Sequence, residues 1–571
     1  MQKVLTAAQM REVDRLTTER YGIPSIILME NAAHAVARVI TEKLGGSVKG
    51  KSILILCGKG NNGGDGAALA RILHEQGARI EVNLFGKIEE TRGDAKVNFE
   101  RLAQIASTDF GSKGALYFEE VPTIDYWVHT TGTGIGDFDI AVDAIFGTGL
   151  KRPLDDLFRT APEVWKKRCR SADLSTSDTT ITLSVDIPTG LNSDEEVEPS
   201  IRFESDVTVT FTAPKRANIL PPASRSNGEL VLTDIGSPKE LIDELPSHLY
   251  MAERADASAW LEKTAFSSDD YKNKRGHALL IAGSENYSGA AVLAGNAAMR
   301  SGVGLTTLAC PANAKTEIAS RLLPDVILKS IESNGPEDLV NGADAIAVGC
   351  GLDANDAGIE KLVRHIVDTR EVPVIVDAGA LWYFNPPDGI LQKPARVGSP
   401  HVSKGSSNNE STATSPNWPP ADAGGSALVL TPHEGEFLRL LGTDDKDAIK
   451  DRVAAVREFS QKNDVMLVLK GERVLIGEPG GKVVVNPTGN SGLGKAGNGD
   501  TLTGILAGFV AQAVKINIDI FETVVAAVYI AGMAGDVAEK KYGKRVMTAS
   551  DVRECLADVF LQFQDEFVVR L

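Results

Sequence analysis

The sequence predicts an α/β protein with two doubly wound domains. From residue 51 onward, short β-rich runs alternate with helical stretches, which is the pattern of βαβ units and of parallel sheets covered by helices. Glycine-rich loops at residues 58–66 and 489–504 each follow a hydrophobic run and precede a helical stretch. With 571 residues, the chain is also too long for a single hydrophobic core.

The first domain is expected at residues 1–238. It opens on an amphipathic helix that lacks the apolar run of a signal peptide. A second helix, over residues 67–76, follows the first glycine loop. Buried apolar and β-branched runs predict strands, or strand-then-loop units, at residues 52–57, 79–85, 139–150, 182–192, 206–215 and 228–236.

The polar stretch 239–254 is interpreted as a linker, and the second domain is expected at residues 255–571. Its strand runs each end in a glycine or polar cluster, which suits ligand binding at the carboxyl ends of parallel strands. They fall at residues 277–284, 304–310, 344–351, 373–381, 427–436 and 464–471. Residues 385–425 are rich in Ser, Asn, Pro and Gly, which indicates a disordered insertion.

Composition narrows the class of protein. The net charge of −17 argues against a broad nucleic-acid-binding face, which would have to be basic. The five cysteines are scattered and form no CxxC pair, so we expect reduced thiols in a cytoplasmic protein. No stretch of about 18 uncharged apolar residues occurs, so no membrane span is expected.

The first glycine loop, GKGNNGGDG, satisfies the GxGxxG pattern after a strand. The next strand lacks the acidic residue that usually binds a ribose, so the ordinary dinucleotide interpretation fails. Asn61, Asn62 and Asp65 could instead contact a ribose phosphate or a cation. The alternative is a strand–helix turn that simply needs several glycines.

Two further strand ends should meet at the same edge of the sheet. Asp143 precedes FGTGL and the basic pair Lys151–Arg152, which together suit an anion. Asp186, in SVDIPTG, could shuttle a proton from a strand end. The side chains of Asn62, Asp143 and Thr189 offer only hard oxygen ligands, which suit an alkali or alkaline-earth cation. Taken singly, each Asp could equally be a turn residue or a helix cap.

The second loop, GNSGLGKAGNGDTLTG, brings backbone N–H groups and a helix start toward a phosphate. Asp500 opens that helix, and we expect the helix dipole to hold its carboxylate ionised. Beside a phosphoryl donor, this carboxylate can accept a proton from an attacking hydroxyl. The alternative is an ordinary first-turn Asp of a buried helix. His433, alone after a strand, is as well explained by packing or capping as by substrate contact.

Residues 1–236 resemble the NAD(P)H-hydrate epimerase family through TAAQMREVD, MENAA, GKGNNGGDG, VDAIFGTGL, SVDIPTGLN and TFTAPK. The resemblance implies a Rossmann-like domain that interconverts the R and S epimers of NAD(P)H hydrated at the nicotinamide C6, with Asp186 at the reacting ring. It implies potassium binding by Asn62, Asp143 and Thr189, where the family more often has Ser at the last position. The implied substrate-binding residues are Asn61, Asn62, Gly63, Gly64, Asp65, Gly147, Thr148, Gly149, Leu150, Lys151, Arg152, Pro153 and Asp186.

Residues 255–571 resemble the ribokinase-like superfamily and, within it, the ADP/ATP-dependent NAD(P)H-hydrate dehydratases. The motifs are NKRGHALLIAGSENYSGAAVLAGNAAMRSGVG, VDAGAL, LTPHEGE, LKGERV and GNSGLGKAGNGDTLTG. The resemblance implies that Asp500 deprotonates the C6 hydroxyl of the S hydrate, and that ADP, with Mg²⁺, then transfers a phosphoryl group. Loss of phosphate would regenerate NAD(P)H, with AMP as co-product. Hydrate contacts would be Ala290, Gly351, His433 and Asp500; nucleotide contacts would be Lys470, Gly471, Glu472, Arg473, Val474 and Gly499.

This chain departs from the dehydratase motifs at four positions. Cys350 stands for a proline and Asp353 for a glycine; Gly379 stands for an aspartate and Val474 for a threonine or aspartate. These positions bear on nucleotide choice more than on reaction type. ADP rather than ATP is inferred from fused family members.

The sequence thus predicts a bifunctional enzyme that epimerises NAD(P)H hydrates and dehydrates the S form. The expected partners are the two hydrates and ADP, without nucleic acid or membrane, in a homo-oligomer. One alternative is a vitamin or sugar kinase of ribokinase-like fold with a non-catalytic N-terminal binding domain. The ribokinase-like fold hosts many such kinases, and a fold does not determine a function.

Overall fold

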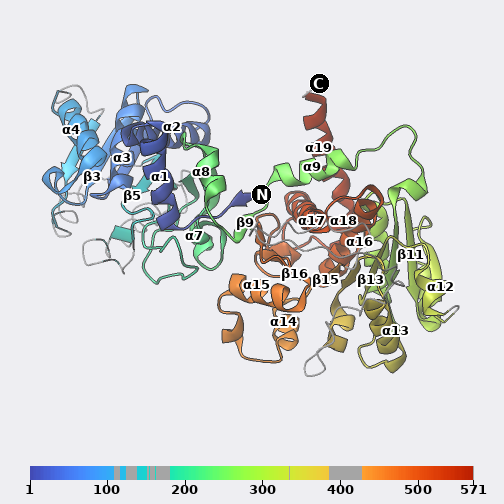
Figure 1. The fold of residues 1–571 in the computed structure, drawn as a ribbon. Helices are drawn as coiled ribbons and strands as arrows, with labels where there is room; N and C mark the ends of the chain where they lie inside the picture. Colours follow the sequence, from blue (N-terminus) through green and yellow to red (C-terminus); the bar gives the residue numbers. More distant parts are fainter. Residues whose placement is uncertain are drawn as a thin grey trace, which may run out of the picture. The chain divides into compact units, whose positions relative to one another are not determined.

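A computed structural model describes residues 1–108, 116–123, 126, 138–150, 154, 158, 161–162, 180–332, 335–384 and 427–569. The chain divides into two compact units, Gln2–Ser247 and Met1 with His248–Leu571. Each unit is a mainly parallel sheet with helices packed against it (Figure 1), which confirms the predicted α/β fold class. The expected disordered insertion at residues 385–425 lies outside the described residues.

The first unit contains a parallel sheet in the order β4-β3-β2-β5-β6-β7-β8. Its strands are β2 (Ser52–Cys57), β3 (Arg79–Leu84), β4 (Leu116–Glu120), β5 (Ile140–Ala144), β6 (Ile181–Val185), β7 (Val207–Phe211) and β8 (Glu229–Thr233). The strand order turns back between β2 and β5, because β3 and β4 lie on one side of β2 and the later strands on the other. Ligands of open α/β sheets bind at such a switch point, beyond the carboxyl ends of the strands.

Both faces of this sheet are buried. Ile53 and Ile55 of β2 pack into one apolar cluster with α2 and α3, and Leu54 and Leu56 pack into another. The helical segments are α1 (Ala7–Tyr21), α2 (Ser25–Lys43), α3 (Asn61–Glu75), α4 (Gly93–Thr108), α7 (Arg216–Ile219) and α8 (Lys239–Glu244), with short turns η1 (Ile88–Glu90) and η2 (Ala223–Ser226). The chain opens on a two-residue strand, β1 (Gln2–Lys3).

Helix α3 begins earlier than the sequence predicted. The helix was expected over residues 67–76, after a glycine loop, but α3 starts at Asn61. The glycines of the motif therefore form the first turns of the helix, where they permit close packing. A Cβ on Gly63 would lie 1.8 Å from the Gly58 carbonyl oxygen, so no larger residue fits there.

The sheet of the second unit runs in the order β9-β18-β17-β16-β15-β14-β13-β10-β11-β12. Strand β17 is antiparallel to both neighbours, and the other pairings are parallel. The bounds are β9 (Leu249–Met251), β10 (His277–Ile281), β11 (Leu305–Cys310), β12 (Ile327–Ser330), β13 (Ala345–Val348), β14 (Val374–Val376), β15 (Leu428–Leu430), β16 (Met466–Leu469), β17 (Val474–Gly477) and β18 (Val483–Asn486). Part of the expected linker 239–254 therefore belongs to this sheet, because β9 pairs with β18.

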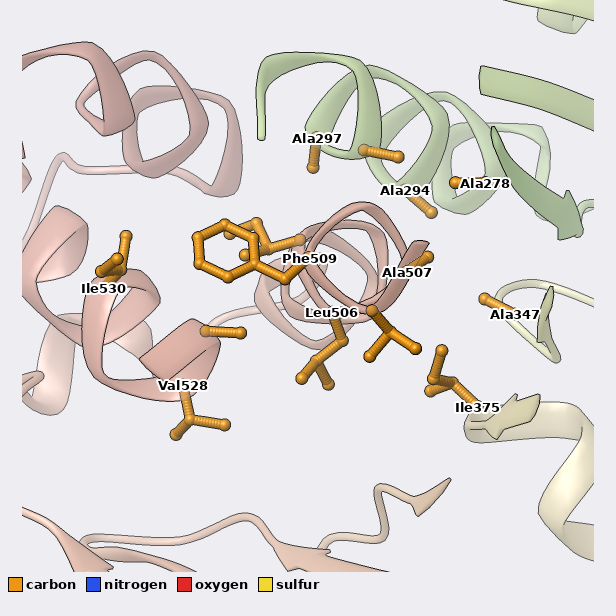
Figure 2. Close-up of a cluster of buried hydrophobic side chains, with 14 of the residues drawn as sticks. Ala278, Ala294, Ala297, Ala347, Ile375, Leu506, Ala507, Phe509, Val528 and Ile530 are labelled. Atoms are coloured by element: carbon orange, nitrogen blue, oxygen red, sulfur yellow. The ribbon is translucent and has the colours of Figure 1, made fainter. Parts of the chain in front are cut away.

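Helix α16 (Asn498–Ile516) is the central helix of the second unit. Figure 2 shows Leu506, Ala507 and Phe509 of this helix among side chains from α10 (Ser288–Arg300), α17 (Ile520–Tyr542) and the sheet. Glycines let α10 approach closely: a Cβ on Gly504 would lie 2.1 Å from the Ala294 carbonyl oxygen. Helix α16 also packs against β10, β13 and β14, and Gly499 in its first turn lies close to Asp377, which follows β14.

The other helical segments of the second unit surround this core. They are α9 (Arg254–Lys263), α11 (Lys315–Ala319), α12 (Pro336–Val340), α13 (Ala357–Asp368), α14 (Glu434–Leu440), α15 (Arg452–Asn463), α18 (Ala549–Glu554) and α19 (Leu556–Val569), with turns η3 (Lys272–Arg275), η4 (Ala312–Ala314), η5 (Ala378–Phe384), η6 (Lys446–Ile449) and η7 (Ser491–Leu493). Among the described helices, α17 alone is long and apolar enough to cross a membrane, but 67% of its most apolar window is buried inside the protein. It packs in the core with α16 and α9.

Candidate active sites

The first candidate site lies at the switch point of the first sheet. The amino end of α3 follows β2, the turn containing Gly147 follows β5, and Asp186 follows β6. A Cβ on Gly147 would lie 2.9 Å from Asp186 Oδ2 and 3.2 Å from Asn62 Oδ1, so both side chains reach the same turn. The structure thus brings together the three motifs that the sequence placed at one sheet edge. The predicted residues Lys151, Arg152 and Pro153 lie outside the described residues.

The carboxylate of Asp186 is held from two sides. Oδ1 accepts hydrogen bonds from Lys215 Nζ at 2.7 Å and from Thr210 Oγ1 at 3.0 Å, and Oδ2 accepts one from the Thr148 backbone N–H at 3.3 Å. Asp186 has a φ of 66°, in the left-handed region that costs a non-glycine residue about 1 kcal/mol or more. With Oδ1 doubly occupied, Oδ2 is the oxygen that faces the Gly147–Thr148 turn.

Lys215 is a site residue that the sequence analysis did not assign. The residue is 1% exposed, and its ammonium donates to Asp186, to Thr210 Oγ1 at 2.9 Å and to the Phe211 carbonyl at 3.1 Å. All three N–H groups are therefore used inside the protein. The only available signal was the lysine of the TFTAPK motif, and its partners could not be read from that motif.

Two more carboxyl groups lie near this ion pair. Burial raises the pKa of Asp14 to about 6; the charge of Lys215 opposes the rise and that of Asp186 adds to it. Burial, with the charges of Asp186 and Asp14, also raises the pKa of Asp65 well above its ordinary value. Asp65 was a predicted substrate contact, whereas Asp14, in the MREVD segment, was not. A buried carboxyl that holds its proton can donate a hydrogen bond to a substrate oxygen.

Two of the three predicted cation ligands are in contact. Thr189 donates to Asp143 twice, from its hydroxyl at 2.7 Å and from its backbone N–H at 2.8 Å. Asp143 is fully buried, and burial raises its pKa to about 6, although hydrogen bonds from Thr189, Ile145 and Ser184 oppose the rise. The third ligand, Asn62, lies at the Gly147 turn, and its Nδ2 is buried without a hydrogen-bond partner.

The second candidate site lies where α16 meets the carboxyl ends of β13, β14 and β16. A Cβ on Gly499 would lie 3.4 Å from Lys470 Nζ, so the first turn of α16 covers the lysine that follows β16. Asp500 occupies the same turn. Gly351 follows β13 with a φ of 67°, and its Cβ position is 2.8 Å from Ala290 Cβ. The structure therefore brings Asp500 together with Gly499 and Lys470, two predicted nucleotide contacts, and brings Gly351 together with Ala290, two predicted hydrate contacts.

Asp377, at the end of β14, is the second residue that the sequence analysis did not assign. It is 1% exposed; its Oδ1 accepts from Lys470 Nζ at 2.7 Å and its Oδ2 accepts from Thr503 Oγ1 at 2.8 Å. Although burial works in the opposite direction, Lys470 and the neighbouring hydroxyls keep the pKa of Asp377 below its ordinary value. The only sequence signal was its position in VDAGAL.

The surroundings of Asp500 act against the helix dipole. The dipole favours the ionised carboxylate, whereas burial raises its pKa to about 6, a value at which the group is still mostly ionised at neutral pH. Burial is the largest cause, followed by repulsion from Asp377, while the Cys350 thiol and Lys470 oppose the rise. A first-turn dipole contributes on the order of 1 kcal/mol and is outweighed here by desolvation.

His433 is the N-cap of α14. Its Nδ1 accepts hydrogen bonds from the backbone N–H groups of Gly435 and Glu436, at 3.0 and 3.3 Å, and Glu436 accepts in return from the His433 N–H at 2.8 Å. The spacing of His433 fitted packing or capping as well as substrate contact, and the structure shows capping. The ring is still 60% exposed, so contact with a substrate stays a prediction.

The remaining predicted nucleotide contacts lie in the turn between β16 and β17. Gly471 and Glu472 are exposed at this turn, and Val474 begins β17. Arg473 donates to the Pro487 carbonyl at 2.6 Å, and Arg452 donates to the Arg473 carbonyl at 3.3 Å. The turn begins at the residue after Lys470.

Comparison with known families matches both halves of the chain. Residues 25–217 match the family described as YjeF-related protein N-terminus. Residues 278–403 and 420–557 match the family described as NAD(P)H-hydrate dehydratase. The first match contains the Asp186 site and the second contains the Asp500 site.

Full-length relatives combine both halves. The bifunctional NAD(P)H-hydrate repair enzyme Nnr of Moorella thermoacetica is 32% identical over 99% of this chain and 97% of its own length. The enzyme of the same name from Salinibacter ruber is 31% identical over 97% of this chain and 96% of its own length. A solved structure of an ADP/ATP-dependent NAD(P)H-hydrate dehydratase from Bacillus subtilis is 28% identical, covers 55% of this chain and 98% of its own, and has a TM-score of 0.43.

Proposed function

This chain belongs to the family of bifunctional NAD(P)H-hydrate repair enzymes, and on that premise we propose which of its sites carries which reaction. The site at Asp186 epimerises the R and S forms of NAD(P)H hydrate. The site at Asp500 dehydrates the S form to NAD(P)H at the expense of ADP. The observation that carries the division is that each family match contains one of the two carboxylates, Asp186 beside the Gly147–Thr148 turn and Asp500 beside the Cys350 thiol.

Asp186 is the proposed proton carrier of epimerisation. Epimerisation at C6 requires the C6 oxygen substituent to change face, and a proton must be given to or taken from that oxygen. The ion pair with Lys215 occupies Oδ1, so Oδ2 is left to exchange the proton beside the Gly147–Thr148 turn. The backbone N–H groups of this turn and the amino end of α3 are proposed to hold the phosphates of the hydrate.

We propose that Asn62, Asp143 and Thr189 bind a potassium ion. They fit such an ion because a carboxylate, a hydroxyl and an amide oxygen form a hard-oxygen donor set. The groups that lower the pKa of the buried Asp143 carboxyl are the hydrogen-bond donors Thr189, Ile145 and Ser184, so its negative charge is left for a cation to balance. When bound, the ion would supply a positive charge that stabilises this carboxylate and the substrate phosphates.

Asp500 is the proposed base of dehydration. It takes the proton of the C6 hydroxyl while that oxygen bonds to the terminal phosphorus of ADP and the bond from this phosphorus to AMP breaks. The C6–oxygen bond then breaks, phosphate leaves with the electron pair, and loss of a proton from C5 restores the ring double bond. Lys470 and the amino end of α16 would face the transferred phosphate.

Mg²⁺ would arrive with ADP, bound chiefly through the nucleotide's phosphates, and would neutralise charge on the transferred group. The proposed contacts of ADP are the turn from Lys470 to Val474 and Gly499, and those of the hydrate are Ala290, Gly351 and His433. The four described cysteines are all free and buried, which supports the proposal of a reducing, cytoplasmic setting.

The test is a single assay on the full chain. The protein is incubated with a mixture of R and S NADPH hydrate, potassium, magnesium and ADP, and NADPH is followed by its near-ultraviolet absorbance. Conversion of both epimers is the expected result. Conversion that stops when the S form is exhausted would remove the epimerase assignment, and no conversion with ADP or ATP would remove the dehydratase assignment.

A further inference from the structure

Among the described residues, one carboxylate and one cation act on Asp500 through their charge, Asp377 and Lys470. Asp500, on α16, is influenced by Asp377 after β14, Lys470 after β16 and the neutral Cys350 thiol after β13. Glu436, on α14, also raises the pKa of Lys470 through its charge. The charges that act on Asp500 therefore depend on which carboxylate pairs with the Lys470 ammonium group.

Lys470 is committed to Asp377. The Nζ–Oδ1 distance is 2.7 Å, and Thr503 fixes the other oxygen of Asp377 at 2.8 Å, from the same helix that carries Asp500. Asp377 is 1% exposed, whereas the Lys470 side chain is 21% exposed. The buried Asp377 carboxylate thus holds the Lys470 ammonium in place, while part of the lysine side chain stays exposed in the site.

Gly499 fixes how close the helix approaches this pair. Its Cβ position lies 3.4 Å from Lys470 Nζ and 3.8 Å from Asp377 Oδ2, so the backbone of the first turn of α16 lies directly over both groups. The next residue in that turn is Asp500. The charges of Lys470 and Asp377 therefore act on Asp500 across buried protein, where water screens them weakly.

From this geometry we propose that Asp377 is a positioning residue for dehydration: it holds Lys470 toward the transferred phosphate and, by keeping that cation to itself, leaves Asp500 basic enough to take the substrate's proton. The inference rests on the proposed function of the Asp500 site. Asp377 is 1% exposed, so it acts through Lys470 rather than by direct contact with the hydrate or ADP. A residue with a purely structural role would not change the pH dependence of dehydration.

The experiment measures kcat for dehydration of purified S hydrate by the full chain, with saturating ADP and Mg²⁺, as a function of pH. Asp377→Asn removes a repelling charge and releases Lys470, so the acid limb should move down by about one pH unit. Lys470→Met removes the attracting charge, so the limb should move up by a similar amount. The ionisation of ADP is common to all variants and cannot cause a difference between them.

The double variant Asp377→Asn/Lys470→Met removes both charges and should return the limb to near its wild-type position. It also guards against failure of Asp377→Asn to fold, since no unpaired buried charge remains. Asp344→Asn is the matched control: Asp344 is a largely buried partner of Lys515 in the same unit, 3.0 Å from its Nζ, and its loss should leave the limb unchanged.

Different results would overturn the role of Asp377 and the proposed function of the Asp500 site. If the wild-type chain dehydrates but Asp377→Asn and Lys470→Met lose rate without moving the limb, or move it in the same direction, the inference is wrong and the proposed function stands. If the wild-type chain does not dehydrate the hydrate, or Asp500→Asn still does, the proposed function itself fails.

Discussion

Asp186 and Asp500, the two proposed catalytic carboxylates, have opposite relations to the nearest lysine. Asp186 forms an ion pair with its nearest lysine, because Lys215 donates directly to Oδ1. Asp500 forms no such pair with Lys470, because Lys470 is paired with Asp377. The first carboxylate is therefore held in place by an ion pair, whereas the second is left with a raised pKa of about 6 that suits a general base.

Asp186→Asn should abolish epimerisation and leave dehydration of the S hydrate unchanged, because the two carboxylates lie in different compact units. A decrease of at least about a hundredfold is expected for loss of an acid–base group. Epimerisation is measured by the disappearance of the R form in the absence of ADP. Asp139→Asn is the matched control. Asp139 pairs with Lys51 and comes just before β5, whereas the Gly147 turn of the site follows the other end of β5. An equal loss of both activities would contradict the two-site assignment.

Asp500→Asn should abolish dehydration yet stabilise the fold above about pH 6. Because the pKa in the folded protein is raised from 3.8 to about 6, the folded state binds the proton more tightly than the unfolded chain. The ionised carboxylate therefore destabilises the fold above about pH 6, and this penalty disappears as the pH falls toward about 4. Asparagine removes the penalty, by up to ~3 kcal/mol.

The measurement is denaturant unfolding of both proteins near pH 8 and near pH 4. The free energy of unfolding of Asp500→Asn should exceed that of the wild type at the higher pH, and the gain should vanish at the lower one. A gain of equal size at both pH values would mean that the carboxylate is not the cause.

At the scale of elements, the second site depends on how α16 packs against α10. Gly504 allows this approach, because its Cβ position is 2.1 Å from the Ala294 carbonyl oxygen. The clash is with backbone, so neither helix can relieve it by rotating a side chain. Any displacement of α16 would move Asp500 and Gly499 together.

Gly504→Ala should therefore lower the free energy of unfolding by about 1–3 kcal/mol and reduce dehydration more than epimerisation. Denaturant unfolding and the two separate assays check this. Gly480→Ala is the control in the same unit, because its Cβ would meet only the flexible Glu478 side chain, at 3.4 Å. Similar stability losses in both variants would contradict the packing argument.

At the scale of the whole molecule, the two reactions share one diffusible substrate. Dehydration consumes only the S hydrate, and epimerisation replenishes it from the R form. The two units each have their own sheet and core, so either site should work when the other is inactive.

A mixture of the Asp186→Asn and Asp500→Asn chains should therefore convert both epimers completely to NADPH, whereas neither chain does so alone. Near-ultraviolet absorbance at equal total protein measures the yield. Failure of the mixture, with each chain active in its own half-reaction, would mean that the hydrate must pass between sites of one molecule.

The sequence by itself determined the parallel-sheet architecture and the places of the two glycine-rich motifs, because strand runs, glycine motifs and strand-end carboxylates are local patterns. Tertiary structure decided what those patterns leave open. Asp377 and Lys470 are 93 residues apart, and Asp186 and Lys215 are 29 apart, so their pairing depends on strand order. The raised pKa of Asp500 likewise depends on burial and on Asp377, which follows β14. Electrostatic environment is a property of the assembled sheet edge, and no single segment of the chain contains it.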